Sequence, residues 1–361
     1  MDRNGHISRS SGGAYQAAYS LILLGSLVTT CVVADLIARN RALETWLMAQ
    51  SSILAGKNDT LFSYTGNFID FEERLVLDEL PHTNFSQGGV YFFGTSNMKW
   101  AFTTWDLPPE QKRFIGNYGI GASNHTELLA LIRYLIAQYG FLGAGKKDLV
   151  LFGVSFHLGH MNAAPGASFF AGVLRRQGLF NITPSGAIVS QQMPAIVRWL
   201  RIEKARSAGL LWDVGRVIKG WFELYAGWNQ RGIHNPSQYR QAWREYMGPD
   251  WRDNIDKEVE DFRTTIQLLQ SYQAEVKVIL LPQGTWMDKL PFTQYYDTKI
   301  RALCDATSTP IIDLSRSIPD NEFVDSNHLT TKGQTHLRDL FLPEITNHLR
   351  RIRPSEPSEP G

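Results

Sequence analysis

A serine, an aspartate and a histidine stand where they could act together as a nucleophile, an orienting carboxylate and a base. Ser96 lies in the turn Gly-Thr-Ser-Asn, directly after an apolar run, and Asp325 and His328 are three residues apart near the C-terminus. A serine hydroxyl is a weak nucleophile until a histidine accepts its proton, and that histidine needs a carboxylate to orient its ring. The three residues therefore predict attack on an acyl carbonyl through an acyl-serine, with Ser96, Asp325 and His328 as the catalytic set.

Short apolar runs alternate with helical patterns from about residue 89, which predicts βαβ units and a parallel sheet flanked by helices. The expected strands cover 89–95, 113–119, 148–154, 274–282 and 310–315, and the expected helices cover 125–140, 295–307 and 330–352. Ligands bind outside the carboxyl ends of the strands in such a sheet. The loops after the first three strands and the Asp-x-x-His segment are therefore candidates for one shared crevice.

The alternation stops between about residues 158 and 260, and this segment is interpreted as a helical, tryptophan-rich insertion. Its tryptophans are Trp199, Trp212, Trp221, Trp228, Trp243 and Trp251. Tryptophans in helical patterns usually pack into a core, and the alternatives are a carbohydrate platform or contact with a membrane or partner.

An uncharged apolar segment lies near the N-terminus, over residues 14–34, and has about the length of a helix that crosses a bilayer. We interpret 14–38 as a transmembrane anchor, with a cleaved signal peptide as the rival interpretation. The expected division is a tail over 1–13, the anchor, a juxtamembrane linker over 39–88, a catalytic domain over 89–350 and a disordered tail over 351–361. The net charge of +1 offers no basic field for nucleic acid, and two cysteines indicate no disulfide framework.

Three sequence blocks together resemble the SGNH or GDSL-type serine hydrolases: FFGTSN, NYGIGAS and DSNHLTTKG. The resemblance implies a flavodoxin-like, three-layer α/β fold with Ser96 as nucleophile and the late Asp-x-x-His as orienter and base. It also implies an oxyanion hole that includes the backbone N–H groups of Ser96 and Gly119. The family's third block is typically Gly-x-Asn, whereas Ser155 stands at the asparagine position here. The resemblance does not transfer the role of asparagine to another residue; Ser155 or His157 is the candidate substitute, and Ser155 is taken as the third donor. A different third block also occurs in the membrane-anchored branch that includes the D-alanyl-lipoteichoic-acid and alginate or cellulose acetylation proteins.

These observations predict a membrane-anchored serine O-acyltransferase, with O-acetyl transfer to a cell-surface or exported polysaccharide on the periplasmic or extracellular side. The expected partners are an acyl donor, the polysaccharide acceptor and a membrane-bound acyl-exporting protein, with no cofactor and no metal. A tethered esterase and a catalytically silent glycan-binding subunit are the alternatives. His157 and His160, three residues apart, are the weaker alternative of a metal site.

Overall fold

The structure is a computed structural model that describes the sheet, most of the helices and the loops between them. The described residues are 11–38, 85–101, 114–143, 147–160, 178–183, 187–226, 236–323, 325 and 327–352, with isolated positions between 43 and 83. The predicted tail up to residue 10, most of the linker over 39–88 and the tail from 353 lie outside them.

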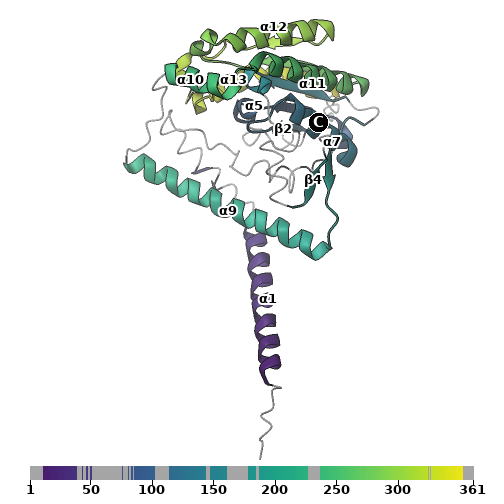
Figure 1. The fold of residues 1–361 in the computed structure, drawn as a ribbon, viewed down its shortest axis with the longest axis vertical. Helices are drawn as coiled ribbons and strands as arrows, with labels where there is room; N and C mark the ends of the chain where they lie inside the picture. Colours follow the sequence, from purple (N-terminus) through teal and green to yellow (C-terminus); the bar gives the residue numbers. More distant parts are fainter. Residues whose placement is uncertain are drawn as a thin grey trace, which may run out of the picture.

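A parallel five-stranded sheet forms the centre of the fold (Figure 1). Its strands are β1 (Val90–Gly94), β2 (Ile115–Gly119), β3 (Leu149–Val154), β6 (Glu275–Leu280) and β7 (Ile311–Asp313). They lie in the order β2-β1-β3-β6-β7, and every neighbouring pair is parallel. This is the flavodoxin-like doubly wound order, which confirms the predicted α/β class with a parallel sheet.

Helices cover both faces of this sheet. They include α5 (Ser96–Ala101), α7 (His125–Tyr139), α11 (Trp251–Ser271), α12 (Pro291–Ala306) and α13 (Thr331–Ile352). Neighbouring side chains of β1 point to opposite faces, so Phe92 meets Phe341 of α13, whereas Phe93 meets Phe152, which in turn contacts Phe262 of α11. The strands β1 and β3 are buried throughout, as expected when helices cover both faces.

The predicted insertion contains a small hairpin and two helices. Strands β4 (Phe180–Ile182) and β5 (Ile188–Ser190) pair in antiparallel fashion, followed by α9 (Ala195–Ala226) and α10 (Pro236–Met247). Short 3-10 turns complete the described elements: η2 (Phe85–Gln87), η3 (Phe156–Gly159), η4 (Thr285–Lys289) and η5 (Asp320–Glu322).

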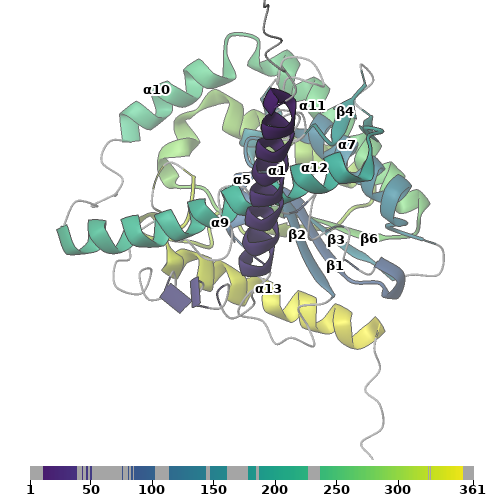
Figure 2. The same ribbon diagram turned by 90° about the horizontal axis from the view of Figure 1, so that it is seen from below.

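The N-terminal helix α1 (Ser11–Ala38) stands apart from the sheet. It packs against α9 and runs away from the rest of the fold, and Figure 2 shows the two helices crossing from a second direction. Among the residues that the structure describes, no helix meets the length and hydropathy required for a membrane span.

Candidate active site

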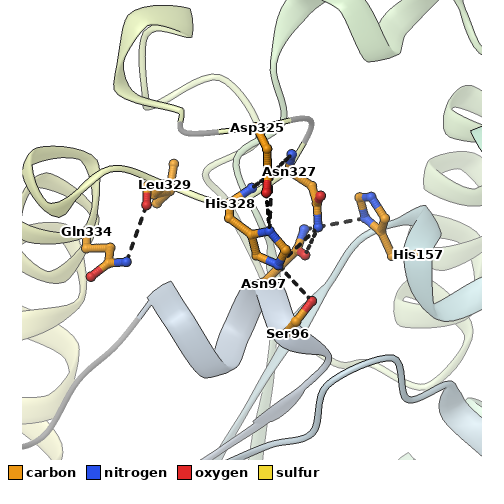
Figure 3. A network of polar contacts seen from close by, with 8 residues as sticks. All are labelled: Ser96, Asn97, His157, Asp325, Asn327, His328, Leu329 and Gln334. Atoms are coloured by element: carbon orange, nitrogen blue, oxygen red, sulfur yellow. Dashed lines mark hydrogen bonds and ion pairs between the residues drawn. The ribbon is translucent and has the colours of Figure 1, made fainter. Parts of the chain in front are cut away.

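The structure brings Ser96, His328 and Asp325 into one hydrogen-bonded row (Figure 3). Nε2 of His328 lies 3.0 Å from Oγ of Ser96. On the other side of the ring, Nδ1 lies 2.9 Å and 3.1 Å from the two carboxylate oxygens of Asp325. The predicted nucleophile, base and orienting carboxylate are thus all within hydrogen-bonding reach, although more than 200 residues separate the serine from the other two in the sequence.

Close backbone packing after β1 places Ser96 at the start of α5. A side chain at Gly94 would put its Cβ 2.6 Å from the carbonyl oxygen of Gly153 and equally close to Cβ of Met98, so only glycine fits. The carbonyl of Thr95 then accepts hydrogen bonds from the N–H groups of Met98 and Lys99, which begins the helix. Ser96 is the first helical residue, and its hydroxyl faces the loop that carries His328.

Asp325 also organises the loop on which it stands. Its Oδ1 accepts hydrogen bonds from the backbone N–H groups of Asn327 and His328, each at 2.9 Å. Burial alone would raise the pKa of this carboxyl, but the hydrogen bond and charge of His328 and the two N–H groups lower it below its ordinary value. Asp325 is therefore held as a carboxylate, the form that can orient an imidazole and stabilise its protonated state.

Two asparagines, Asn97 and Asn327, lie beside this hydrogen-bonded row, and neither was singled out from the sequence. Asn97, the buried neighbour of Ser96, accepts a 2.7 Å hydrogen bond from Nδ2 of Asn327, and that same nitrogen lies 3.4 Å from Nε2 of His328. The sequence did offer one indication of their role: Asn97 directly follows Ser96, and Asn327 directly precedes His328.

At the position of the Gly-x-Asn block, this chain has a buried pair, Ser155 and His157. Oγ of Ser155 lies 2.8 Å from Nδ1 of His157, and Nδ2 of Asn97 lies 3.4 Å from the same nitrogen. Burial, with the nearby charges of His328 and His160, lowers the pKa of His157 well below its ordinary value, so the ring is neutral. The hydroxyl of Ser155 is thus already engaged with His157 in this arrangement.

Gly119, the predicted second donor of the oxyanion hole, is the last residue of β2. A Cβ at this position would lie 2.5 Å from the backbone nitrogen of Lys99, so the glycine allows α5 to pack closely against the strand. Its N–H donates a 3.0 Å hydrogen bond to the side-chain oxygen of Asn117. A substrate oxyanion would have to replace that oxygen as acceptor, and the role of Gly119 stays a prediction.

Helix α10 places aromatic side chains beside these groups. The ring of Trp243 contacts that of His157 nearly edge-on, with centroids 4.3 Å apart, and Tyr246 lies 5.0 Å from His160 by the same measure. Burial, and next the charge of Asp325, raise the pKa of Tyr239 on the same helix. Within the described ranges, His157 and His160 belong to no group of three or more metal-ligating side chains.

A buried carboxyl lies behind His160, where α11 meets the start of α7. Glu258 accepts hydrogen bonds from Nδ2 of Asn124 and from both the N–H and the hydroxyl of Thr126, all at 2.9 Å. The Asn124 amide also donates to the carbonyl oxygen of His160 at 3.3 Å. Burial raises the pKa of Glu258 from its ordinary 4.5 to about 7, even though the hydrogen bonds of Thr126 oppose the shift.

No family model matches the chain, and no curated protein matches it. Solved structures similar to this fold include an acetyl xylan esterase, at 13% identity and a TM-score of 0.37, covering 71% of this chain and 99% of that one. A GDSL-like lipase from Bacteroides thetaiotaomicron shows 11% identity and a TM-score of 0.39, covering 76% and 97%. A putative acylhydrolase from Bacteroides fragilis shows 12% identity and a TM-score of 0.39, covering 78% and 97%. At these identities the likeness concerns the fold alone.

Proposed function

We propose that this protein is a membrane-anchored serine O-acyltransferase that transfers an acyl group onto a cell-surface or exported polysaccharide. The acyl group that we propose is acetyl. The observation that carries the proposal is the hydrogen-bonded row from Ser96 through His328 to Asp325. A catalytically silent binding subunit would have no need of a nucleophile, base and carboxylate at these distances.

The row supports a two-step acyl exchange. Oγ of Ser96 attacks the acyl carbonyl while Nε2 of His328 accepts the hydroxyl proton, and the collapse of the tetrahedral intermediate expels the donor's oxygen, which takes that proton. A sugar hydroxyl then attacks the acyl-serine, gives its proton to His328 and leaves as the ester, after which the proton returns to Ser96. Water in place of the sugar makes the same site an esterase, which is the second candidate.

The negative oxygen of each tetrahedral intermediate needs donors close to Ser96. We assign this role to the backbone N–H groups of Ser96 and Gly119, with Ser155 as the third predicted donor. The carboxamide of Asn327 is an additional candidate, because its nitrogen lies 3.4 Å from the Nε2 atom that faces Ser96. It could supply the amide that the Gly-x-Asn block provides in the family that the chain resembles.

Membrane anchoring is supported by the surface of α1. Four consecutive apolar residues, 21–24, are each more than half exposed, and four successive helical positions point to nearly all sides. A helix that is apolar all round requires an apolar environment on every side. A membrane provides one, and it would bring the site close to a membrane-bound acyl-exporting partner and raise the effective concentration of the donor. The site would then act on the periplasmic or extracellular side.

The acyl-serine can be tested directly by intact-mass spectrometry. We expect the full chain, kept in detergent micelles and mixed with 4-nitrophenyl acetate, to gain one acetyl group. Ser96→Ala should gain none and His328→Ala should gain it much more slowly, whereas Ser271→Ala, which removes an exposed hydroxyl from α11, should behave like the wild type. An adduct that persists in Ser96→Ala would overturn the assignment of the nucleophile.

Transfer and hydrolysis are then separated by adding acetyl-free oligosaccharides to the acylated chain. Acetylated sugar is expected if the protein is a transferase, whereas free acetate with unchanged sugar would favour the esterase. If neither acylation nor ester turnover occurs with the wild type, the serine-enzyme proposal fails as a whole.

A further inference from the structure

Helix α9 exposes an apolar stripe, with one residue near the start of the helix and three near its end. Ile196, Ile218, Phe222 and Tyr225 are 59%, 63%, 58% and 80% exposed, respectively. With about 100° between successive residues, their positions fall within an arc of about 80° although they span most of the 32 residues of the helix. Val217 and Gly220 are buried and lie on another side of the helix. The stripe thus lies on another side of the helix than Val217 and Gly220, whereas the buried Glu203 borders it next to Ile196.

Two exposed lysines of α9 lie at or near one edge of this stripe. The sequence of α9 contains six basic residues and three acidic ones, a difference of three positive charges. Among those whose side chains the structure describes, Arg198, Lys204 and Lys219 are exposed. On the helical wheel Lys204 falls at the edge of the apolar arc and Lys219 about 60° beyond it, whereas Arg198 lies nearer to Gly220 than to the arc. An apolar strip with cations along its border is the pattern of a helix that lies in the headgroup region of an anionic membrane.

The position of α1 relative to α9 agrees with such a surface. The two helices cross and contact each other, and α1 leaves α9 on the side opposite to the bulk of the sheet and its helices (Figures 1 and 2). Helix α1, which carries exposed apolar side chains, thus extends away from the fold on the side of α9. Because the two helices are in contact, a lipid phase that surrounds α1 would also reach α9.

We infer that α9 lies in the plane of the membrane surface, with its apolar stripe at the boundary between headgroups and acyl chains and its cations at the lipid phosphates. The occupant of the stripe is an anionic lipid bilayer, chosen because of the two lysines at its edge, the net positive charge of α9 and the contact of α9 with α1. This inference rests on the anchoring part of the proposed function. It adds a second membrane contact, one that would limit rotation of the catalytic fold about α1.

Depth-dependent quenching in single-chain lipid nanodiscs tests the inference. The full chain would carry Cys31→Ser and one engineered cysteine bearing an environment-sensitive fluorophore, since the remaining native Cys304 is buried. The sites are Phe222→Cys on α9, Leu23→Cys on α1 and Gln241→Cys on the exposed face of α10, which is remote from α1 in Figure 1. Nitroxide-labelled lipid in phosphatidylglycerol discs should quench the α9 label at least about threefold more than the α10 label.

The other outcomes distinguish failure of this inference from failure of the anchor. Quenching at Leu23→Cys with none beyond the control at Phe222→Cys would keep the anchor and overturn the interfacial position of α9. No quenching at either site would overturn both. A separate preparation with two chains per disc tests for self-association. If lipid does not quench the α9 label in single-chain discs, and the label is shielded from aqueous iodide only in the two-chain discs, a second copy covers the stripe and the inference is wrong. Replacing phosphatidylglycerol by phosphatidylcholine should weaken quenching at α9 and leave that at α1 unchanged, and equal quenching at α9 in both lipids would contradict the role given to its cations.

Discussion

At the scale of single residues, the site depends on which nitrogen of His328 carries its proton. The carboxylate of Asp325 faces Nδ1, and Ser96 faces Nε2. A carboxylate can only accept, so it keeps the proton on Nδ1 and leaves Nε2 with the lone pair that takes the serine proton. A neutral amide at position 325 could donate to Nδ1 and favour the opposite tautomer.

We therefore expect Asp325→Asn to lower kcat by about 10²–10⁴-fold, with KM much less affected, because substrate contacts remain while the base is wrongly protonated. The measurement is steady-state hydrolysis of 4-nitrophenyl acetate. Asp339→Asn, which removes a carboxylate 59% exposed on α13, should leave both parameters unchanged. Full activity in Asp325→Asn would contradict the orienting role.

Asn327 is expected to contribute through the transition state. If its amide donates to the developing oxyanion, Asn327→Ala should lower kcat by about 10²-fold while KM changes little. Asn347→Ala, at an exposed position of α13, is the matched control. A rise in KM with unchanged kcat would instead assign Asn327 to ground-state binding.

The sequence predicted Ser96, Asp325 and His328 because each belongs to a motif of fixed spacing. It could not predict the bond between Asn97 and Asn327, since that contact joins positions 230 residues apart and exists only after the sheet forms. The engagement of Gly119 with Asn117 was likewise hidden, because a glycine in a motif does not reveal which acceptor its N–H meets.

At the scale of elements, the strands were predictable because buried parallel strands are continuous apolar runs bounded by glycine and polar turns. The hairpin of β4 and β5 was not predicted, because strands of three residues are too short to show alternation. Nor did local pattern reveal that Glu258 of α11 binds the N-terminal turn of α7 through Asn124 and Thr126. That junction holds two helices together through a carboxyl removed from water.

We expect ionisation of Glu258 to lower the free energy of unfolding as pH rises from about 4.5 to about 7. Its pKa is raised in the folded state, so the folded chain binds more protons than the unfolded chain in this window, and the stability it contributes below pH 4.5 is lost as pH passes 7. A shift of this size corresponds to about 3 kcal/mol. Glu258→Gln should therefore be more stable than wild type at pH 8 and closest to it near pH 4.5.

The check is the urea midpoint of each variant at pH 5 and pH 8. Glu260→Gln, on the same helix and with a side chain 66% exposed, should keep the pH dependence of the wild type. An unchanged slope in Glu258→Gln would show that the carboxyl is ionised throughout this range.

At the scale of the whole molecule, the sequence predicted an apolar N-terminal segment, and residues 11–38 form one helix. It did not predict that α1 would cross α9, because the two segments are far apart in the chain. The apolar pattern of a helix indicates that it is helical but does not identify the helix it packs against. The candidate site and the exposed apolar surface of α1 lie in different parts of the molecule. The aromatic and polar groups of the site belong to the sheet domain, whereas the exposed apolar residues of α1 lie outside it (Figure 1).

This separation predicts that attachment and chemistry can be changed independently. Leu23 is 56% exposed on α1, and an aspartate there would face the hydrocarbon of a bilayer at a cost of about 3 kcal/mol. Leu23→Asp should reduce the partition of the full chain into phosphatidylglycerol vesicles by about 100-fold, measured by flotation, because each 1.4 kcal/mol corresponds to a factor of ten. Gln241→Asp on exposed α10 introduces the same charge and should not change partition. Unchanged partition of Leu23→Asp would mean that α1 is covered by something other than lipid. Both variants should acquire the acetyl group at the wild-type rate in micelles, since neither residue contacts Ser96, His328 or Asp325.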